Sequence, residues 1–449
     1  MVLGLILIPI YVQATAWSAG FGVYGWFRLS QVAAAVSPKI AIASVIWIHA
    51  MAATPACFLF CSIGLQRSFD STVRQALLDF GPWFAIVRVL VRKVWPWIAA
   101  SAFWTIAMTG NDMVVTNLFQ VATITESVYQ QVQFNALDAG SIGLACSFAI
   151  LIALVALVLK WVSKVHLGME NAAAMDRDDY QAFGLHGVWR WSGFALGWTI
   201  VAMVVLVPIA NLIVKAGWVA TIDNEMIRRG WSPMVFATSI WQSRSFSSEL
   251  AWSIQLSLYS SGLALVLGLM LIEVSRFRWT EWIVFGSLAF LLALPGPIVN
   301  LAVMSLLDRN EPRWMAYLAD RTLFGPILAL QARCLPIVFV VLYIAMERFK
   351  RKNHYLMQLD RGLPQWIRFW ILFKAVRSPL VTALVLAFFV AFADLSSYLL
   401  VQPPQVTTVA MRMFDLLHYG IKNRESGLAL TLVIFAMLPT IVFARRIGL

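Results

Sequence analysis

The stretch DFGPW at residues 79–83 and the stretch DRGLPQW at residues 360–366 decide the fold, because they read as two copies of one element. Each lies in a basic, polar break between long apolar runs. Each is followed by a cationic helix-like segment and then by an apolar run with one acid, Asp112 or Asp394. The acid follows the glycine of its element by 31 residues in the first copy and by 32 in the second. This spacing predicts a duplicated membrane protein, an architecture most often found in transport pores.

The composition agrees with a membrane protein. The chain has 449 residues, of which 61% are hydrophobic and only 12% charged, and its mean hydropathy is +0.78. A soluble protein carries about 25% charged residues, whereas a bilayer-spanning helix needs about 20 apolar residues. We therefore predict an all-α polytopic membrane protein with about ten transmembrane helices. The expected spans lie near residues 3–26, 40–64, 95–117, 139–163, 192–215, 251–274, 281–307, 326–347, 378–402 and 426–446.

The basic residues predict the orientation of these spans. One set of alternate breaks includes 65–94 and 348–377, and together with the C-terminal tail this set holds 21 Lys and Arg residues. The other set holds 12. Because cytoplasmic loops carry the excess of positive charge, we expect the first set and both termini to face the cytoplasm. The net charge of +12 then reflects loops that face anionic lipid, and we expect no nucleic acid partner.

An offset of about 281 residues relates further spans. It maps residues 3–26 onto 284–307 and residues 139–163 onto 420–444. We predict a first module of four spans at 1–169, a cytoplasmic linker at 170–190 and a second module of six spans at 191–449. Relative to the second module, the first one is expected to lack two helices at its amino end.

The basic breaks themselves are candidate docking elements. In the second one, four basic residues alternate with four aromatic residues between 361 and 377, as in an amphipathic helix on a membrane face. A simple interfacial anchor explains one such segment. Two copies at matched positions favour docking to a cytoplasmic partner.

These elements resemble the integral-membrane permeases of ABC importers, in the subgroup that handles ferric iron, thiamine and polyamines. In that family a cytoplasmic loop with a Glu-Ala-Ala stretch, a glycine and a final Leu-Pro docks into the ATPase subunit. Further matches are Leu294-Pro295-Gly296 for the family's Leu-Pro-Gly element, residues 411–420 for its Arg-Ile-x-x-Leu-x-His-Tyr-Gly segment and residues 123–129 for its Thr-x-Thr-x-x-Ile-Tyr stretch. Similarity covers most of the chain.

The resemblance implies roles for individual residues. The ATPase-coupling candidates in the two loops are Gln75, Ala76, Asp79, Gly81, Asp360, Gly362 and Pro364. In the second loop Leu356-Met357-Gln358 stands in place of Glu-Ala-Ala, which is a departure from the family pattern. The implied partners are an ABC ATPase dimer on the cytoplasmic side, an extracytoplasmic solute-binding protein and the lipid bilayer.

The candidate transport pathway comprises Asp112, Asp394, Pro295 and Gly296. Proline removes a helix hydrogen bond and glycine adds freedom, so we expect a bend at residues 295–296. An acid at membrane depth is costly and usually faces a cavity or a partner. The two acids either line the outer mouth of the pathway or are helix-end acids bonded to backbone groups or to Arg. Arg333 is expected to snorkel or to pair with Asp320 or another acid.

Enzyme motifs are absent from the sequence. It has no Gly-x-x-x-x-Gly-Lys-Ser/Thr phosphate loop, no His-Glu-x-x-His element and no Gly-x-Ser-x-Gly elbow. The apolar surroundings of the four cysteines and of His49 predict core positions rather than a metal site, and no cofactor is expected. We expect the permease subunit of an ABC importer in a prokaryotic plasma (inner) membrane, with ferric iron as the favoured solute and ATP hydrolysis in a partner. The alternative is a degenerate or regulatory protein derived from such a permease that no longer transports.

Overall fold

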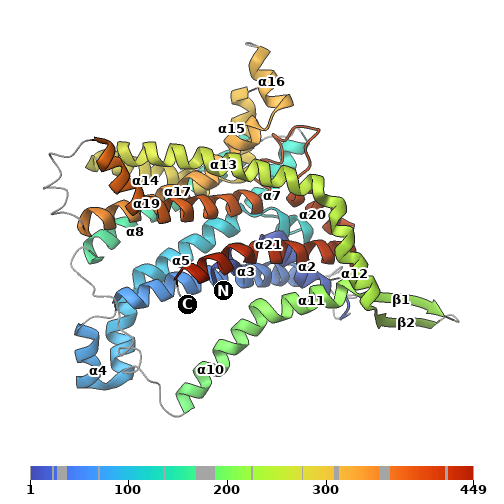
Figure 1. Ribbon diagram of the computed structural model, residues 1–449, viewed down its shortest axis with the longest axis horizontal. Coiled ribbons are helices and arrows are strands. Elements are labelled where there is room, and N and C mark those ends of the chain that lie inside the picture. The colour runs from blue at the N-terminus through green and yellow to red at the C-terminus, as the bar shows by residue number, and fades with distance from the viewer. Residues whose placement is uncertain are drawn as a thin grey trace. The chain divides into compact units, whose positions relative to one another are not determined.

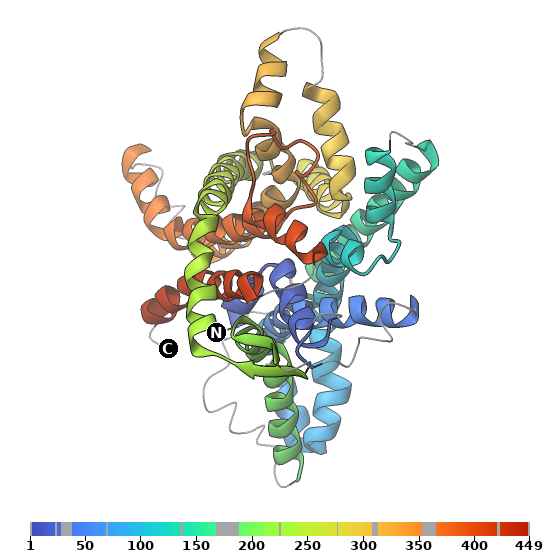
Figure 2. The same cartoon turned by 90° about the vertical axis from the view of Figure 1, so that its right-hand side faces the viewer.

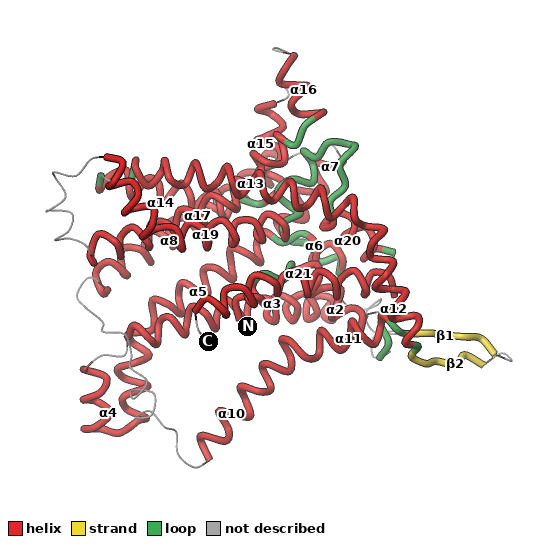
Figure 3. The backbone as a smooth tube through the Cα atoms, viewed as in Figure 1, coloured by secondary structure: helices red, strands yellow, loops and turns green. Residues whose placement is uncertain are grey.

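The chain folds almost entirely into helices. The computed structural model describes residues 2–22, 25–27, 38–68, 71–134, 138–167, 188–223, 226–275, 277–307, 313–352, 365–419 and 423–447 (Figure 1). Strands β1 (Trp218–Asp223) and β2 (Met226–Trp231) form an antiparallel hairpin that extends beyond its flanking helices (Figure 3). The predicted linker at 170–190 falls mainly outside these residues.

The long apolar helices indicate a multi-pass membrane protein. In the described part of the chain, five helical stretches are long and apolar enough to cross a bilayer, and a bent pair at Arg278–Ala293 and Gly296–Leu307 brings the number to six. The five are Pro38–Gln66, Ala139–Trp161, Arg190–Ala216, Pro233–Val274 and Phe324–Glu347. These five stretches fall on five of the ten predicted spans, and the bent pair falls on a sixth, 281–307. The other four predicted spans fall on segments that are not among these helices, so the number ten stays a prediction.

The first part of the chain forms one ordered series of helices. A short α1 (Val2–Ile6) ends before Pro9, and α2 (Ile10–Phe21) begins after it. The series continues with α3, α4, the π-helix η1, α5, α6, α7 and α8, which span Pro38–Ser68, Ser71–Phe84, Ala85–Leu90, Val91–Asn111, Val114–Leu118, Ile124–Gln133 and Ala139–Leu167.

The last part of the chain forms a similar series. Helix α14 (Arg278–Ala293) ends before Pro295, and α15 (Gly296–Leu307) follows it. After α16 (Arg313–Arg321), the series continues with α17, α19, α20 and α21, which span Phe324–Lys352, Gln365–Ala393, Val409–His418 and Asn423–Ile447. The two post-proline helices, α2 and α15, both have 12 residues. The order of elements is therefore consistent with the duplication predicted from the sequence.

Between the two series lies a segment that has no counterpart in the first. It contains α10, the π-helix η2 and α11, then the hairpin, and then α12, the short η3 and α13. The helices span Val188–Val201, Ala202–Leu206, Val207–Ala216, Pro233–Gln242, Ser243–Phe246 and Ser247–Val274.

The contacts divide the chain into two compact units, and each unit draws on both series. Unit 1 comprises Met1–Ala122, Leu154–Arg244 and Leu416–Leu449, and unit 2 comprises Thr123–Ala153 and Ser245–Asp415. Thus α21 packs with α2 and α11 in unit 1, whereas α7 packs with α15 in unit 2. The two modules predicted from the sequence are defined by a repeated pattern along the chain, whereas the two units are defined by packing. The modules therefore stay a prediction.

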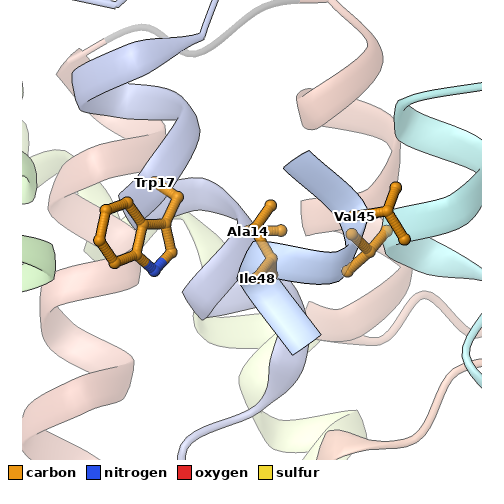
Figure 4. Close-up of a cluster of buried hydrophobic side chains, with 5 residues drawn as sticks. Ala14, Trp17, Val45 and Ile48 are labelled. Carbon is orange, nitrogen blue, oxygen red and sulfur yellow. The ribbon is translucent and has the colours of Figure 1, made fainter. Parts of the chain in front are cut away.

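Each unit has an apolar core. In unit 1, Ala14 and Trp17 of α2 pack with Val45 and Ile48 of α3 (Figure 4). In unit 2, α13, α17 and α19 lie side by side and form a bundle (Figures 1 and 2). The buried face of α13 is lined by small residues that include Ser253, Ser257, Ser260, Ala264 and Gly268. Small side chains let helix backbones approach closely, which is how membrane helices commonly associate.

Candidate functional site

The first coupling-loop candidate folds as a helical hairpin. Helix α4 packs back against η1, and Val73, which is fully buried, lies against Leu90 and Val94. The helical backbone of α4 is interrupted at Gly81, whose φ of 81° lies in the region that favours glycine. No atom lies within 4 Å of a Cβ built at this position. Position 81 therefore favours glycine because of its backbone conformation, and not because a side chain would lack room.

The predicted coupling residues of this hairpin lie on different faces. Gln75 and Asp79 are exposed, while Ala76 is buried under the helix. Asp360, Gly362 and Pro364 of the second loop lie outside the described residues. The proposed coupling role of all seven residues stays a prediction.

The outward side of the α4 hairpin carries large apolar side chains. Leu78, Phe80 and Trp83, which we call the α4 patch, are 84%, 66% and 72% exposed. The basic residues Arg74 and Arg88, at either end of this segment, are also exposed. An exposed apolar patch with a polar rim is typical of a surface that meets another protein or a membrane.

The second candidate element is a broken span in unit 2. Helices α14 and α15 meet at an angle of 107°, at Leu294-Pro295-Gly296. The predicted bend at Pro295 and Gly296 is therefore confirmed. A Cβ at Gly296 would lie 2.5 Å from the backbone of Ser396, so only glycine fits this contact. Asn300 of α15 adds a hydrogen bond of 2.9 Å from its amide nitrogen to the Ser396 carbonyl.

Arg333 of α17 stabilises the end of α14. Its guanidinium donates to the carbonyls of Leu291, Leu292 and Leu294 at 3.2, 2.7 and 2.8 Å. In a continuous helix the carbonyls of Leu291 and Leu292 would accept from residues 295 and 296. Proline has no N–H and the chain turns away, so the guanidinium takes the place of the lost donors.

Asp394, which follows α19, completes this cluster. Its carboxylate accepts from the Ser396 hydroxyl and the Ser397 amide at 3.0 and 3.3 Å, and it lies 3.7 Å from Arg333 Nε. Arg333 also donates to the Ser397 hydroxyl at 3.0 Å. Arg333 thus pairs with an acid, although the acid is not Asp320. The cluster joins α14, α17 and the turn after α19.

Asp112 occupies the corresponding position in the first series, directly after α5. Its two carboxylate oxygens accept from the amides of Val114 and Val115 at 3.2 and 3.0 Å, and so satisfy the first two N–H groups of α6. One of them lies 3.2 Å from Nε2 of His49, on α3. In both series, therefore, an acid after the helix binds the following turn and a base from the preceding long helix.

The sequence located the two acids but not their partners. Both carboxylates make the backbone contacts expected of helix-end acids, and a role in a transport pathway stays a prediction. His49 is buried, as predicted for a core histidine, and it also contacts the carboxylate of Asp112. The available signal was the presence of one base in each of the two matching spans, His49 and Arg333.

The described residues contain no group of three or more His, Cys, Asp or Glu side chains that could hold a metal ion. Comparison with known protein families and with curated proteins finds no match for the chain. A function for this protein therefore has to be argued from its own residues.

Proposed function

We propose that this protein is the permease subunit of an ABC importer, driven by an ATPase dimer that docks on the α4 patch. The observation that carries the proposal is the patch itself. Three large apolar side chains point outward from a broken helix that lies between two long apolar segments. Exposed apolar surface of this kind is unfavourable in water and is typical of a face that meets another protein or a membrane, and the proposal assigns it to the ATPase.

The position of the patch supports a coupling role. Helix α4 is fixed to η1 and α5 through the buried side chains of Val73, Leu90 and Val94. Force applied at the patch would therefore act on α5, which ends one residue before Asp112. A ligand or partner shifts a conformational equilibrium only through differential contacts with the two states, and a patch attached to a long helix offers such contacts.

The repeated order of helices supports a permease with two related halves. In this proposal the chain has two modules with about ten spans in the plasma membrane of a prokaryote, and both termini are cytoplasmic. A soluble binding protein delivers the solute at the outer face. Ferric iron is the solute we expect, from the subgroup resemblance alone.

The test is capture of an ABC ATPase by the purified membrane protein, with the ATPase encoded nearest to this chain as the probe. The double variant Leu78→Ala/Trp83→Ala removes most of the α4 patch. The control is Trp198→Ala on α10, because Trp198 is 56% exposed and lies in an apolar helix outside the patch. We expect the double variant to lose capture and the control to retain it.

Capture that is equal in the two variants would remove the α4 patch from the docking surface. Capture without ATP-dependent uptake of labelled ferric iron, thiamine or polyamine would favour the permease-derived protein that no longer transports.

A further inference from the structure

Gln13 of α2 is a buried polar side chain whose amide oxygen has no partner. The residue is 5% exposed, and its Oε1 atom accepts no hydrogen bond from the described part of the chain. A buried acceptor without a donor is unfavourable, and in a folded protein such a group calls for an explanation. Leucine would fill a similar volume at this position without that cost. The amide is therefore a candidate contact for a ligand.

This side chain lines a pocket in unit 1. The pocket lies between α1, α2, the η2–α11 segment and α21, and it encloses about 280 Å³, part of which is open to the surroundings. All of its lining residues belong to unit 1. Among the described residues that line it, Gln13 has the only polar side chain, and the others are aliphatic, such as Val12 and Leu212. The pocket thus offers a single hydrogen-bonding side chain in an apolar wall.

One wall of the pocket departs from a regular α-helix. Val204 and Val205 of this wall belong to the π-helix η2. The amide of Val207 donates to the carbonyl of Ala202, five residues back, where an α-helix would use the carbonyl four residues back. Pro208, which also lines the pocket, has no N–H to donate. Because π-turns are rare and frequently occur at functional sites, this wall is a second feature of a binding site.

We propose that this pocket binds a slender, uncharged amphiphile, namely an alkyl chain that carries a hydroxyl group. The aliphatic walls contact the chain, and Gln13 binds the hydroxyl. A hydroxyl both donates and accepts, so it can donate to Oε1 or accept from the amide nitrogen. A charged ligand is disfavoured, because the described lining residues offer no charge to compensate it. Pockets for drug-sized ligands enclose about 300–1,000 Å³, so the smaller space here favours a single chain over a ring system.

Such a ligand can reach the pocket through the bilayer. The lining residues between 204 and 212 lie in Arg190–Ala216, one of the stretches that are long and apolar enough to cross a membrane. An alkyl alcohol leaves water for lipid because its chain is apolar. Once bound, it would fill space between α2, α11 and α21, which pack on one another, and would stabilise their junction. The inference does not depend on the docking of an ATPase.

The experiment is photolabelling of the full-length protein in lipid nanodiscs. The probe is octanol that carries a diazirine on its chain, and the comparison probe is the corresponding octane derivative without the hydroxyl. Mass spectrometry of peptides locates the labels. We expect the octanol probe to label the segments 5–16 and 204–212 more strongly than the octane probe does, and unlabelled octanol to compete. One additional buried hydrogen bond predicts a preference of roughly threefold to tenfold.

Gln13→Leu is the decisive variant. It removes a buried acceptor that has no partner, so it should fold at least as well as wild type. We expect this variant to lose the preference for the octanol probe, while the octane probe still labels both segments. The matched control, Gln255→Leu, makes the same change at an exposed position of α13 in unit 2 and should keep the preference.

Three results would overturn the proposal. The first is wild-type labelling of the two segments that shows no preference for the hydroxyl, or no labelling of them at all, as expected if only water enters the pocket. The second is a preference that survives in Gln13→Leu. The third is a preference that is lost equally in Gln255→Leu, because the hydroxyl would then be recognised elsewhere.

Discussion

Replacement of Arg333 by leucine should destabilise the protein strongly, because one side chain satisfies several buried groups at once. The guanidinium donates to three carbonyls at the end of α14 and faces the Asp394 carboxylate. Leucine fills a similar space but offers no donor. The carbonyls and the carboxylate would then lie buried without their main partner.

The size of the effect can be bounded. An unsatisfied buried acceptor costs about 1–3 kcal/mol, and removal of one member of a buried ion pair costs about 3–5 kcal/mol. These costs are not additive, because water and local relaxation relieve part of them. We expect Arg333→Leu to reduce the free energy of unfolding by about 3–5 kcal/mol. Arg333→Lys keeps the charge but has fewer donors, so it should lose roughly half of this amount.

Denaturant unfolding of the purified proteins in mixed micelles, followed by circular dichroism, measures these differences. The control is Arg278→Leu at the start of α14, because Arg278 is exposed and should change stability by less than about 0.5 kcal/mol. If Arg333→Leu is no more destabilising than Arg278→Leu, or if Arg333→Lys equals wild type, the guanidinium does not stabilise the broken span.

Three further substitutions, two near the broken span and one in the α4 hairpin, are tested by the same unfolding assay. Gly296→Ala places a methyl group 2.5 Å from the Ser396 backbone and should cost about 1–3 kcal/mol. Its control is Gly262→Ala, which meets no atom within 4 Å and should be neutral or stabilising. Equal effects of the two substitutions would contradict the close packing at Gly296. Asn300→Ala leaves the buried Ser396 carbonyl without its donor and should cost about 1–3 kcal/mol, and a neutral result would show that this bond is dispensable. Gly81→Ala places a side chain at φ 81° and ψ 172°, a backbone region that is almost exclusive to glycine, and should cost about 1–3 kcal/mol. An unchanged stability would mean that the α4 hairpin adopts another backbone.

Features that depend on local chemistry were predictable from the sequence. The run of apolar residues in 326–347 matches the span Phe324–Glu347, because burial in a bilayer demands a continuous stretch of apolar residues. The bend at Pro295 and Gly296 followed from the missing N–H of proline. The break at Gly81 coincides with the glycine singled out by the repeated element.

Features that depend on distant contacts were not predictable in this way. Arg333 and Asp394 are 61 residues apart in the sequence, and nothing local to either residue specifies the other. The three carbonyls that Arg333 binds are backbone groups, which no residue pattern displays. His49 looked like a core residue because its neighbours are apolar, and only the position of α5 brings Asp112 to its ring.

The mixed composition of the two compact units has a physical origin that the repeat alone does not provide. Two series with a similar order of apolar helices can pack in more than one way, so α8 and α21 could each pack within their own series or with elements of the other. The structure adopts the second arrangement for α21, which packs on α2 and α11. Its Asn423 donates to the carbonyls of Ala216 and Trp218, next to the hairpin that the first series lacks. Specific hydrogen bonds to the segment between the two series can therefore decide between packing choices that apolar helix faces alone leave open.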